Sequence, residues 1–310
     1  MRILYTLSVS VAVGIATQAA TKREAVAKAI PLIEKTVGVY IQKRDCFTCH
    51  HQALPLMSLS RAKQFGFKVD DKVVKDQTAF TLEYFADRQD RLPKGQGVVG
   101  GPYTAGYALA GLRAVNFKPN PTSEALIAYL KKTQHKDGSW RIRTHRPPLE
   151  DSHFTATTLA VQSLPDDAPG RKRALEWLTK TKPNSTEDRV FQILGLASAP
   201  NATLGPVLKL LASQRDDGGF AQQPDMTSDA YATGQALVAL RAAGAMKQFA
   251  PAIQRAEQWL LNNQKPDGSW HVKTRSRPIQ KYFESGFPHG KDQFISLSAT
   301  CWAVLALTGK

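Results

Sequence analysis

The chain has 310 residues, a formal net charge of +15 at neutral pH, 42% hydrophobic residues and only three cysteines. Three cysteines exclude a disulfide-framework protein. The basic residues are spread along the chain without a polybasic tail or a nucleic-acid-binding motif, so nucleic acid is not an expected partner. The charge fits either a solvated basic surface or an anionic ligand.

The first twenty residues predict a secretory signal peptide. Met1-Arg2 is followed by an apolar run over 3–16 and by small residues at 17–20. A positive start, a short apolar core and a small-residue cleavage point are typical of such signals, although an uncleaved anchor helix is the alternative. No later segment is long and apolar enough to cross a bilayer. We therefore expect a mature domain at 21–310, periplasmic or secreted, without an integral membrane segment after cleavage.

Six pairs of helices are expected in chain order after the signal. Six segments rich in Ala, Gly and Thr suit an inner ring, because small residues let helices approach closely: 52–65, 103–115, 153–164, 187–199, 229–243 and 294–308. Six more highly charged segments suit an outer ring: 23–41, 70–90, 122–133, 170–181, 203–213 and 251–263. The pattern predicts an all-α fold, a closed (α/α)6 toroid in one domain, with the first helix closing the ring beside the last inner helix.

Between the first two segments, Cys46, Cys49 and His50 form Cys-x-x-Cys-His. This spacing is typical of c-type haem attachment, in which both thiols bond the haem and the imidazole binds the iron. A zinc site, a redox cysteine pair and a chance match are the alternatives. The predicted export signal supports haem, since covalent haem attachment occurs outside the bacterial cytoplasm. Cys301 lies in an apolar helical pattern and is expected to be a buried thiol.

A repeated phrase marks the ends of three outer segments. It occurs at 134–140, 214–220 and 264–270, each time as glutamine, two residues, aspartate, glycine, one residue and an aromatic. The glycines suit positive φ, the aspartates suit turns, and the aromatics can fold back on the preceding helix. Such repeats predict stacked supersecondary units, and the residues of the phrase are expected to be structural.

With this phrase the chain resembles the squalene-hopene cyclase and prenyltransferase toroid superfamily over nearly all of the mature sequence. The resemblance implies the toroid fold. Cyclases of this superfamily use an Asp-x-Asp-Asp segment as the proton donor, which does not occur here; Asp166-Asp167 does not match it. A narrower resemblance, carried by 146–150, 154–157 and 282–294, is to uncharacterised bacterial proteins that join Cys-x-x-Cys-His to this toroid. It implies an exported, haem-bearing toroid and no known reaction.

The long loops at 134–152, 214–228 and 264–293 should share one face with the Cys-x-x-Cys-His segment, and function usually lies in such loops. His50 would be the proximal iron ligand and His289 the favoured sixth ligand. Four arginines would bind haem propionates or an acidic ligand, or form a solvated rim: Arg143, Arg146, Arg275 and Arg277. Four acids are candidates for general acid or base, or for helix caps and arginine partners: Glu150, Asp151, Glu284 and Asp292.

The main functional hypothesis is therefore an exported toroid with one covalent haem c. It would transfer electrons to a redox partner protein or oxidise a small hydrophobic or anionic ligand at the toroid mouth. The alternative is a haem-free toroid, either a squalene or terpenoid cyclase-like protein or one that binds a lipid or glycan. Whether the chain is an enzyme is left open, and the missing acid segment argues against cyclase activity.

Overall fold

The computed structural model describes residues 21–197 and 200–309, and in these residues it has twelve α-helices and no strand. The expected signal peptide at 1–20 lies outside the described residues. The inner helices are α2 (Leu54–Gln64), α4 (Pro102–Ala114), α6 (His153–Ser163), α8 (Thr186–Leu196), α10 (Ala230–Ala242) and α12 (Gln293–Leu307). The outer helices are α1 (Lys22–Lys43), α3 (Asp71–Ala86), α5 (Pro121–Thr133), α7 (Pro169–Lys180), α9 (Pro200–Leu211) and α11 (Ala250–Asn263).

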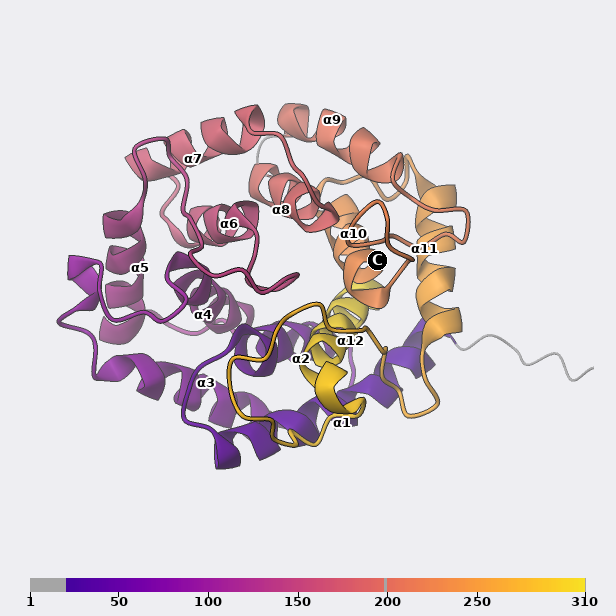
Figure 1. Ribbon diagram of the computed structural model, residues 1–310, viewed down its shortest axis with the longest axis horizontal. Coiled ribbons are helices and arrows are strands. Elements are labelled where there is room, and N and C mark those ends of the chain that lie inside the picture. The colour runs from indigo at the N-terminus through magenta and orange to yellow at the C-terminus, as the bar shows by residue number, and fades with distance from the viewer. Residues whose placement is uncertain (1–20, 198–199, 310) are drawn as a thin grey trace, which may run out of the picture.

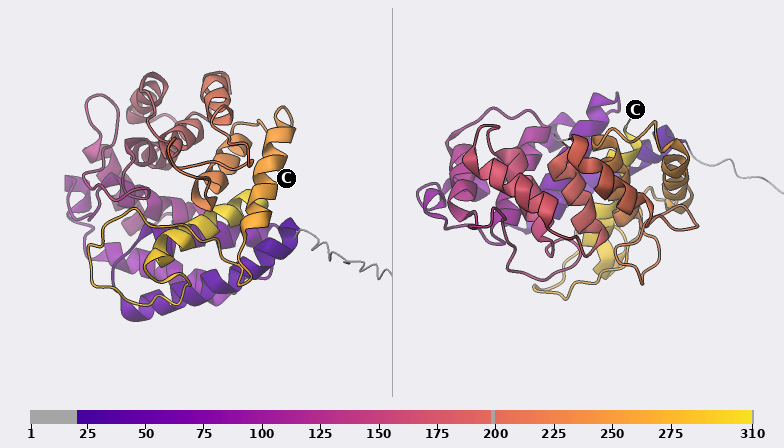
Figure 2. Two further views of the ribbon diagram at one scale, coloured as in Figure 1. Left: turned by 45° about the vertical axis from the view of Figure 1, so that its right-hand side comes forward. Right: turned by 90° about the horizontal axis from the view of Figure 1, so that it is seen from above.

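The helices form two concentric rings, as the sequence predicts (Figure 1). Each inner helix packs against the next, and α12 packs against α2, so the inner ring is closed. Helix α1 lies beside α12 and completes the outer ring (Figure 2). None of the described helices is long and apolar enough to span a membrane.

Small residues allow the close packing of the inner ring. A Cβ on Gly106 in α4 would lie 2.6 Å from Leu159 Cβ in α6, and one on Gly234 in α10 would lie 2.8 Å from the Trp302 carbonyl carbon in α12. Both distances are too short for real atoms, so only glycine permits these helix spacings. The inner helices are buried on nearly all sides, whereas the outer helices bury one face.

The repeated phrase ties each outer helix to the next one. The Gln134 side-chain amide donates to the carbonyls of Gly138 and Gly170, the second of which belongs to α7. The Gln264 amide donates in the same way to Gly268 and to Ala25 in α1, so the third copy closes the ring. The predicted structural role of the phrase is confirmed. Its glycines have φ near +90°, although they lie in the turn after the helix rather than at the helix end.

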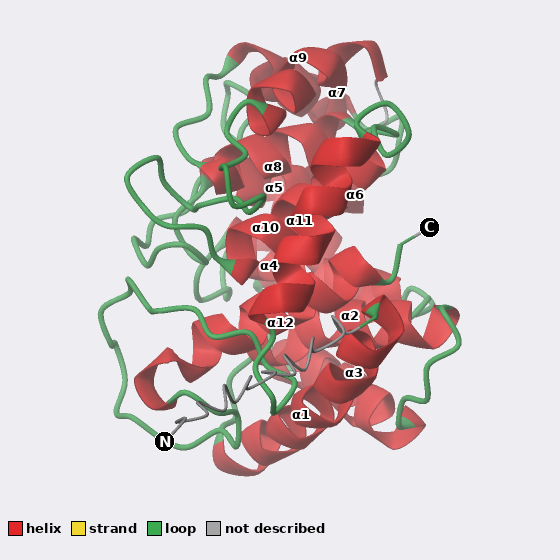
Figure 3. Cartoon of the chain, turned by 90° about the vertical axis from the view of Figure 1, so that its right-hand side faces the viewer, coloured by secondary structure: helices red, strands yellow, loops and turns green. Residues whose placement is uncertain are grey.

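The long connections gather at one face of the rings, as predicted (Figure 3). This face carries the segments between α5 and α6, between α9 and α10, and between α11 and α12. The Cys-x-x-Cys-His segment is only partly a loop. Its last two residues begin a π-helical turn, Cys49–Ala53, which continues directly into α2. Two short 3₁₀ turns complete the described structure, at Leu92–Lys94 and Gly290–Asp292.

Candidate functional site

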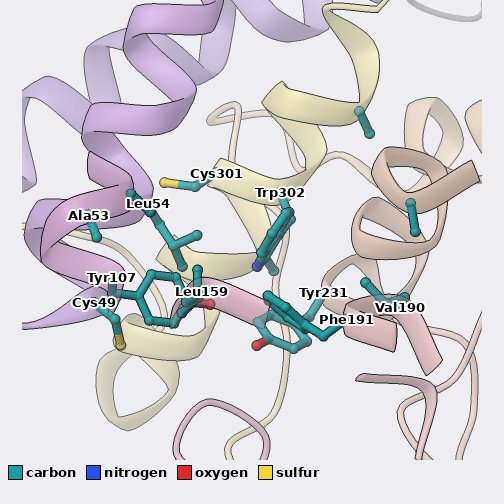
Figure 4. Close-up of a cluster of buried hydrophobic side chains, with 14 of the residues drawn as sticks. Cys49, Ala53, Leu54, Tyr107, Leu159, Val190, Phe191, Tyr231, Cys301 and Trp302 are labelled. Carbon is teal, nitrogen blue, oxygen red and sulfur yellow. The ribbon is translucent and has the colours of Figure 1, made fainter. Parts of the chain in front are cut away.

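Aromatic side chains from four inner helices line the interior of the ring. We call this group the interior aromatic cluster: Tyr103, Tyr107, Phe191, Tyr231 and Trp302. Tyr103 and Tyr107 pack edge to face with their ring centres 4.9 Å apart, and Phe191 meets Trp302 at 6.2 Å. Figure 4 shows Phe191, Tyr231 and Trp302 close together in this interior, with Tyr107 and Leu159 to one side of them. All five are almost completely buried, so the centre of the toroid is apolar with aromatic faces.

Glu187 is a buried carboxyl group next to this cluster. It lies in the first turn of α8 and is only 5% exposed. The Thr155 hydroxyl donates to one carboxyl oxygen at 2.8 Å and the Tyr231 hydroxyl donates to the other at 2.9 Å. Burial raises the pKa of Glu187 to about 8, against the lowering effect of the two hydrogen bonds. At neutral pH this side chain is therefore mostly a neutral acid with a proton to give.

A small pocket on the long-loop face reaches Glu187 from outside. We call it the mouth pocket. Its volume is about 200 Å³, and its lining includes Glu187, Tyr231, Gln235, Asp188 and Arg275. The Gln235 side chain is 1% exposed, and neither its amide nitrogen nor its amide oxygen has a hydrogen-bond partner among the described residues. The pocket thus joins a neutral acid to an amide that is free to bind a polar group.

The structure does not bring the four predicted arginines together as one anion site. Arg146 pairs with Glu150 across a single β-bridge in the loop. Arg275 lines the mouth pocket and donates to the Gln222 side chain at 2.9 Å. Arg143 and Arg277 are exposed on different loops. Of the four arginines, only Arg275 lines the pocket that contains Glu187, while Arg146 lies near Cys49 and His50.

Of the four predicted acids, only Asp151 lines the mouth pocket, and it also accepts from His145 at 2.5 Å. Glu150 pairs with Arg146, as the arginine-partner alternative expects. Asp292 accepts from the Thr274 backbone and from His271. Glu284 is exposed and accepts from Tyr282. These hydrogen bonds are consistent with holding the loops in place. Asp151 lies in the same pocket as Glu187, but none of the four acids is fully buried beside the interior aromatic cluster as Glu187 is.

The Cys-x-x-Cys-His segment packs into the core, and its residues do not fit a haem. The Cys49 sulfur lies 3.8 Å from the Tyr103 hydroxyl in the interior, whereas the Cys46 sulfur lies 3.1 Å from the Tyr40 hydroxyl of α1. The two thiols thus face different tyrosines, and both are already packed. The His50 ring stacks on Phe294 at 4.8 Å.

The side chains proposed as iron ligands are engaged elsewhere. One ring nitrogen of His50 contacts a ring nitrogen of His51, and burial lowers the pKa of His50 to about 3. His289 contacts the Ser269 hydroxyl at 2.7 Å and stacks on His271. Across residues 21–197 and 200–309, no group of three or more His, Cys, Asp or Glu side chains is placed to hold a metal ion. His50 and His289, the two predicted iron ligands, thus contact different protein groups and do not face a common site.

Two family models match the sequence. The squalene-hopene cyclase C-terminal domain matches residues 188–310, and the prenyltransferase alpha-alpha toroid domain matches residues 99–192. The fold and both matches agree. The chain is an α/α toroid. The broader of the two predicted resemblances is thereby confirmed, whereas no comparison supports the haem-bearing variant.

Two curated relatives are squalene–hopene cyclases. The toroid is 28% identical over 180 residues to "Squalene--hopene cyclase" of Bradyrhizobium diazoefficiens and 27% identical over 180 residues to "Probable squalene--hopene cyclase" of Sinorhizobium fredii. Each match covers 56% of this chain and 23% of the relative, so the match spans about a quarter of the relatives' length.

Solved structures with the same fold include a protein from Actinoplanes, with a TM-score of 0.62, 16% identity, and coverage of 92% of this chain and 98% of that one. The type II terpene cyclase MstE from Scytonema has a TM-score of 0.57 at 16% identity, covering 91% and 98%. A variant of MstE in complex with its substrate, geranylgeranyl dihydroxybenzoate, has a TM-score of 0.56 at 16% identity, covering 92% and 97%. At this identity the likeness concerns the fold.

The hypothesis of a haem-dependent electron-transfer or oxidising protein is wrong. One family model and both curated relatives point to squalene-hopene cyclases, and the second family model is a prenyltransferase toroid domain. The physical reason lies in the surroundings of the Cys-x-x-Cys-His segment, which a residue spacing does not contain. The segment has Tyr103 on one side and Tyr40 on another, and it forms part of the wall of the interior. The haem-free alternative fits the findings better.

Sequence reasoning missed Glu187 and Gln235. Glu187 stands in Ser-Thr-Glu-Asp, and a serine followed by acids is typical of a helix start, so the sequence pattern alone does not single it out. The structure assigns the cap to Ser185, which accepts from the Asp188 backbone. One signal was available: Glu187 and Gln235 lie in segments assigned to the buried inner ring, where a charged or amide side chain needs an explanation.

Proposed function

We propose that this toroid is an acid-catalysed enzyme of the type II terpene cyclase kind, which protonates an isoprenoid ligand in the ring interior. The observation that carries the proposal is Glu187, a buried carboxyl group beside the interior aromatic cluster, with the Thr155 and Tyr231 hydroxyls on its two oxygens. Glu187 takes the role of the missing Asp-x-Asp-Asp segment. The likeness to cyclase sequences and structures supports the same class of reaction.

In this reaction the Glu187 carboxyl group gives its proton to one carbon of an alkene. A C–H bond forms, the π bond breaks, and a carbocation remains on the more substituted carbon. A second π bond of the same ligand then attacks the cation and closes a ring. Loss of a proton from a neighbouring carbon leaves a new alkene, and that proton returns to the Glu187 carboxylate. The product is an isomer of the substrate, so no oxidant or reductant is needed.

The surroundings of Glu187 have to drive the proton transfer, because a carboxylic acid is a weak acid towards an alkene. Hydroxyl groups of Thr155 and Tyr231 already donate to the carboxyl oxygens and stabilise the carboxylate that forms. The faces of Tyr231, Tyr107 and Trp302 carry negative electrostatic potential and stabilise a carbocation by cation–π attraction. Both charges develop in a buried interior, where such interactions are stronger than in water, and together they have to outweigh the cost of burial that raises the pKa of Glu187.

The test is turnover of defined isoprenoids by the purified chain. Squalene and geranylgeraniol are incubated with the protein at pH 7, and products of unchanged mass are identified by gas chromatography with mass spectrometry. Loss of a general acid typically costs about 10²–10⁴-fold in rate, so we expect Glu187→Gln to lose at least about 100-fold. Glu176→Gln, at an exposed position of α7, is the matched control and should turn over normally.

Unchanged turnover by Glu187→Gln would overturn the assignment of the acid. Retention of an isoprenoid without any product would indicate a binding protein rather than an enzyme. From residues 1–20 we propose in addition that the toroid acts outside the cytoplasm, which fractionation of the producing cells would test.

A further inference from the structure

We infer that the mouth pocket binds an uncharged, hydroxyl-bearing head group of the isoprenoid ligand, and that Gln235 is the residue that selects it. This inference rests on the proposed function for the nature of the ligand's tail. The head-group preference itself comes from the pocket, and it is measured by binding rather than by turnover.

The first step is the unpaired amide of Gln235. The side chain is 1% exposed and lines the mouth pocket, and both of its polar atoms lack a partner in the described part of the chain. Buried amides are nearly always hydrogen-bonded, because leaving one unpaired costs free energy. Leucine would fill the same position on an inner helix at no such cost. A bound group that pairs with the amide explains why a glutamine stands here.

The second step is the type of group that can pair with it. A primary amide offers a donor at its nitrogen and an acceptor at its oxygen. A hydroxyl group offers both in return. A carboxylate has no proton for the amide oxygen, and an ammonium has no lone pair for the amide nitrogen. Gln235 therefore matches a hydroxyl better than either ion.

The charges that line the mouth pocket also favour an uncharged head group. Asp151 and Asp188 line it with one guanidinium, that of Arg275, while Glu187 is mostly neutral at pH 7. Two carboxylates against one cation disfavour an anionic head group. The Asp188 carboxylate is already paired, since it accepts from the Ser152 hydroxyl at 2.6 Å and from the Asn184 backbone at 3.0 Å. It is thus poorly placed to bind a cation.

The third step is size and position. At about 200 Å³ the mouth pocket is smaller than the roughly 300–1,000 Å³ typical of sites that enclose a drug-sized ligand. It therefore takes a head group rather than a whole isoprenoid. Glu187 and Tyr231 both line the pocket; Tyr231 belongs to the interior aromatic cluster, and its hydroxyl donates to Glu187. A head group held by Gln235 fixes which carbons of the tail lie near the acid, so Gln235 is a positioning residue.

The experiment measures binding of three C20 probes that share one skeleton: geranylgeraniol, geranylgeranoic acid and the corresponding hydrocarbon. Binding to the full chain at pH 7 is followed by quenching of tryptophan fluorescence. We expect the alcohol to bind at least tenfold more tightly than the acid or the hydrocarbon. Gln235→Leu, which keeps the size and removes the hydrogen bonds, should lose this preference while its affinity for the hydrocarbon stays the same.

Two further variants keep the test decisive. Gln235→Asn keeps an amide but withdraws it from the pocket by one carbon, so it should also weaken alcohol binding. Gln254→Leu, on the exposed side of α11, should bind all three probes like the unaltered protein. Equal affinity for the three probes, or an alcohol preference that survives in Gln235→Leu, would overturn the inference, as would failure to bind any of them.

The failure of the head-group inference and the failure of the proposed function are distinguishable. Glu187→Gln should lose turnover and keep the alcohol preference, whereas Gln235→Leu should lose the preference. A selective alcohol site without any turnover would leave the head-group inference intact and remove the enzyme. Turnover without a preference for the alcohol would support the proposed function and overturn the head-group inference.

Discussion

Replacing Glu187 with glutamine should change how the stability of the toroid depends on pH. The carboxyl group has a pKa of about 8 in the folded protein and an ordinary value of 4.5. Because the folded pKa is raised, the folded state keeps the proton while the unfolded state releases it above pH 4.5. Stability is therefore highest below pH 4.5 with respect to this group, and it is lost progressively as the pH rises towards 8.

The size of the effect follows from the two pKa values. They differ by about 3.5 pH units, and each unit corresponds to 1.36 kcal/mol, so the full loss is on the order of 5 kcal/mol. That is a large part of the roughly 5–15 kcal/mol of a typical domain. Glutamine is nearly isosteric and has no proton to lose in this range. Its amide oxygen can accept from one of the Thr155 and Tyr231 hydroxyls, and its amide nitrogen can donate to the oxygen of the other.

The assay is urea unfolding followed by tryptophan fluorescence at pH 5, 6, 7, 8 and 9. We expect Glu187→Gln to gain stability over the unaltered protein as the pH rises, with most of the gain between pH 5 and 8 and little beyond. Glu176→Gln should follow the unaltered protein throughout. Parallel stability profiles for Glu187→Gln and the unaltered protein would refute the neutral-acid assignment, whatever the activity measurements show.

Three further predictions concern the site and the ring. Tyr231→Phe removes a hydrogen bond that lowers the pKa of Glu187, so the alkaline loss of stability should reach a higher pH; an unchanged or lower midpoint would contradict this. Gly138→Ala should destabilise by at least about 1 kcal/mol, because φ is +92° and the new Cβ would lie 2.4 Å from a backbone oxygen; Gly38→Ala, with open space around it in α1, should stabilise by about 0.5–1 kcal/mol. If Gly138→Ala and Gly38→Ala changed the free energy of unfolding in the same direction, the geometry of the turn at Gly138 would be contradicted. Gln264→Ala removes the amide hydrogen bond to α1 that closes the ring and a second one within the turn, and should cost about 1–3 kcal/mol, with earlier hydrogen exchange in α1. Unchanged protection of α1 would show that the ring is closed by other contacts.

The fold could be predicted because its signals are spread along the whole chain. The inner segment expected at 103–115 is found at Pro102–Ala114, and the outer segment expected at 251–263 is found at Ala250–Asn263. Three copies of the glutamine phrase fix the outer ring, and runs of small residues identify the inner ring. An error in one helix boundary does not change the predicted order of the helices. The outer segment expected at 70–90, for example, ends at Ala86, and its place in the ring is unaffected.

The candidate site could not be predicted in the same way, because it depends on which side chains are buried together. Thr155, Glu187 and Tyr231 come from three helices, and nothing in the sequence says that their polar atoms lie within 3 Å of one another. The loop histidines and acids are predicted as site residues because imidazole and carboxyl groups are common metal ligands and general acids or bases. Most of them have ordinary loop contacts, whereas Glu187 acquires its unusual proton affinity only from burial in the assembled ring.

The Cys-x-x-Cys-His segment shows why a short spacing carries less weight than its surroundings. In the fold, its residues supply apolar and aromatic contacts at the start of α2: Cys49 belongs to the hydrophobic core, and the His51 ring stacks on Tyr40 with centres 4.3 Å apart. Burial keeps His50 and His51 neutral by lowering their pKa values. A neutral imidazole pair and a protonated thiol, whose pKa burial raises to about 12, are packing groups rather than reactive ones. The segment that first suggests redox chemistry thus helps to build the buried wall of the interior on which the proposed acid chemistry at Glu187 depends.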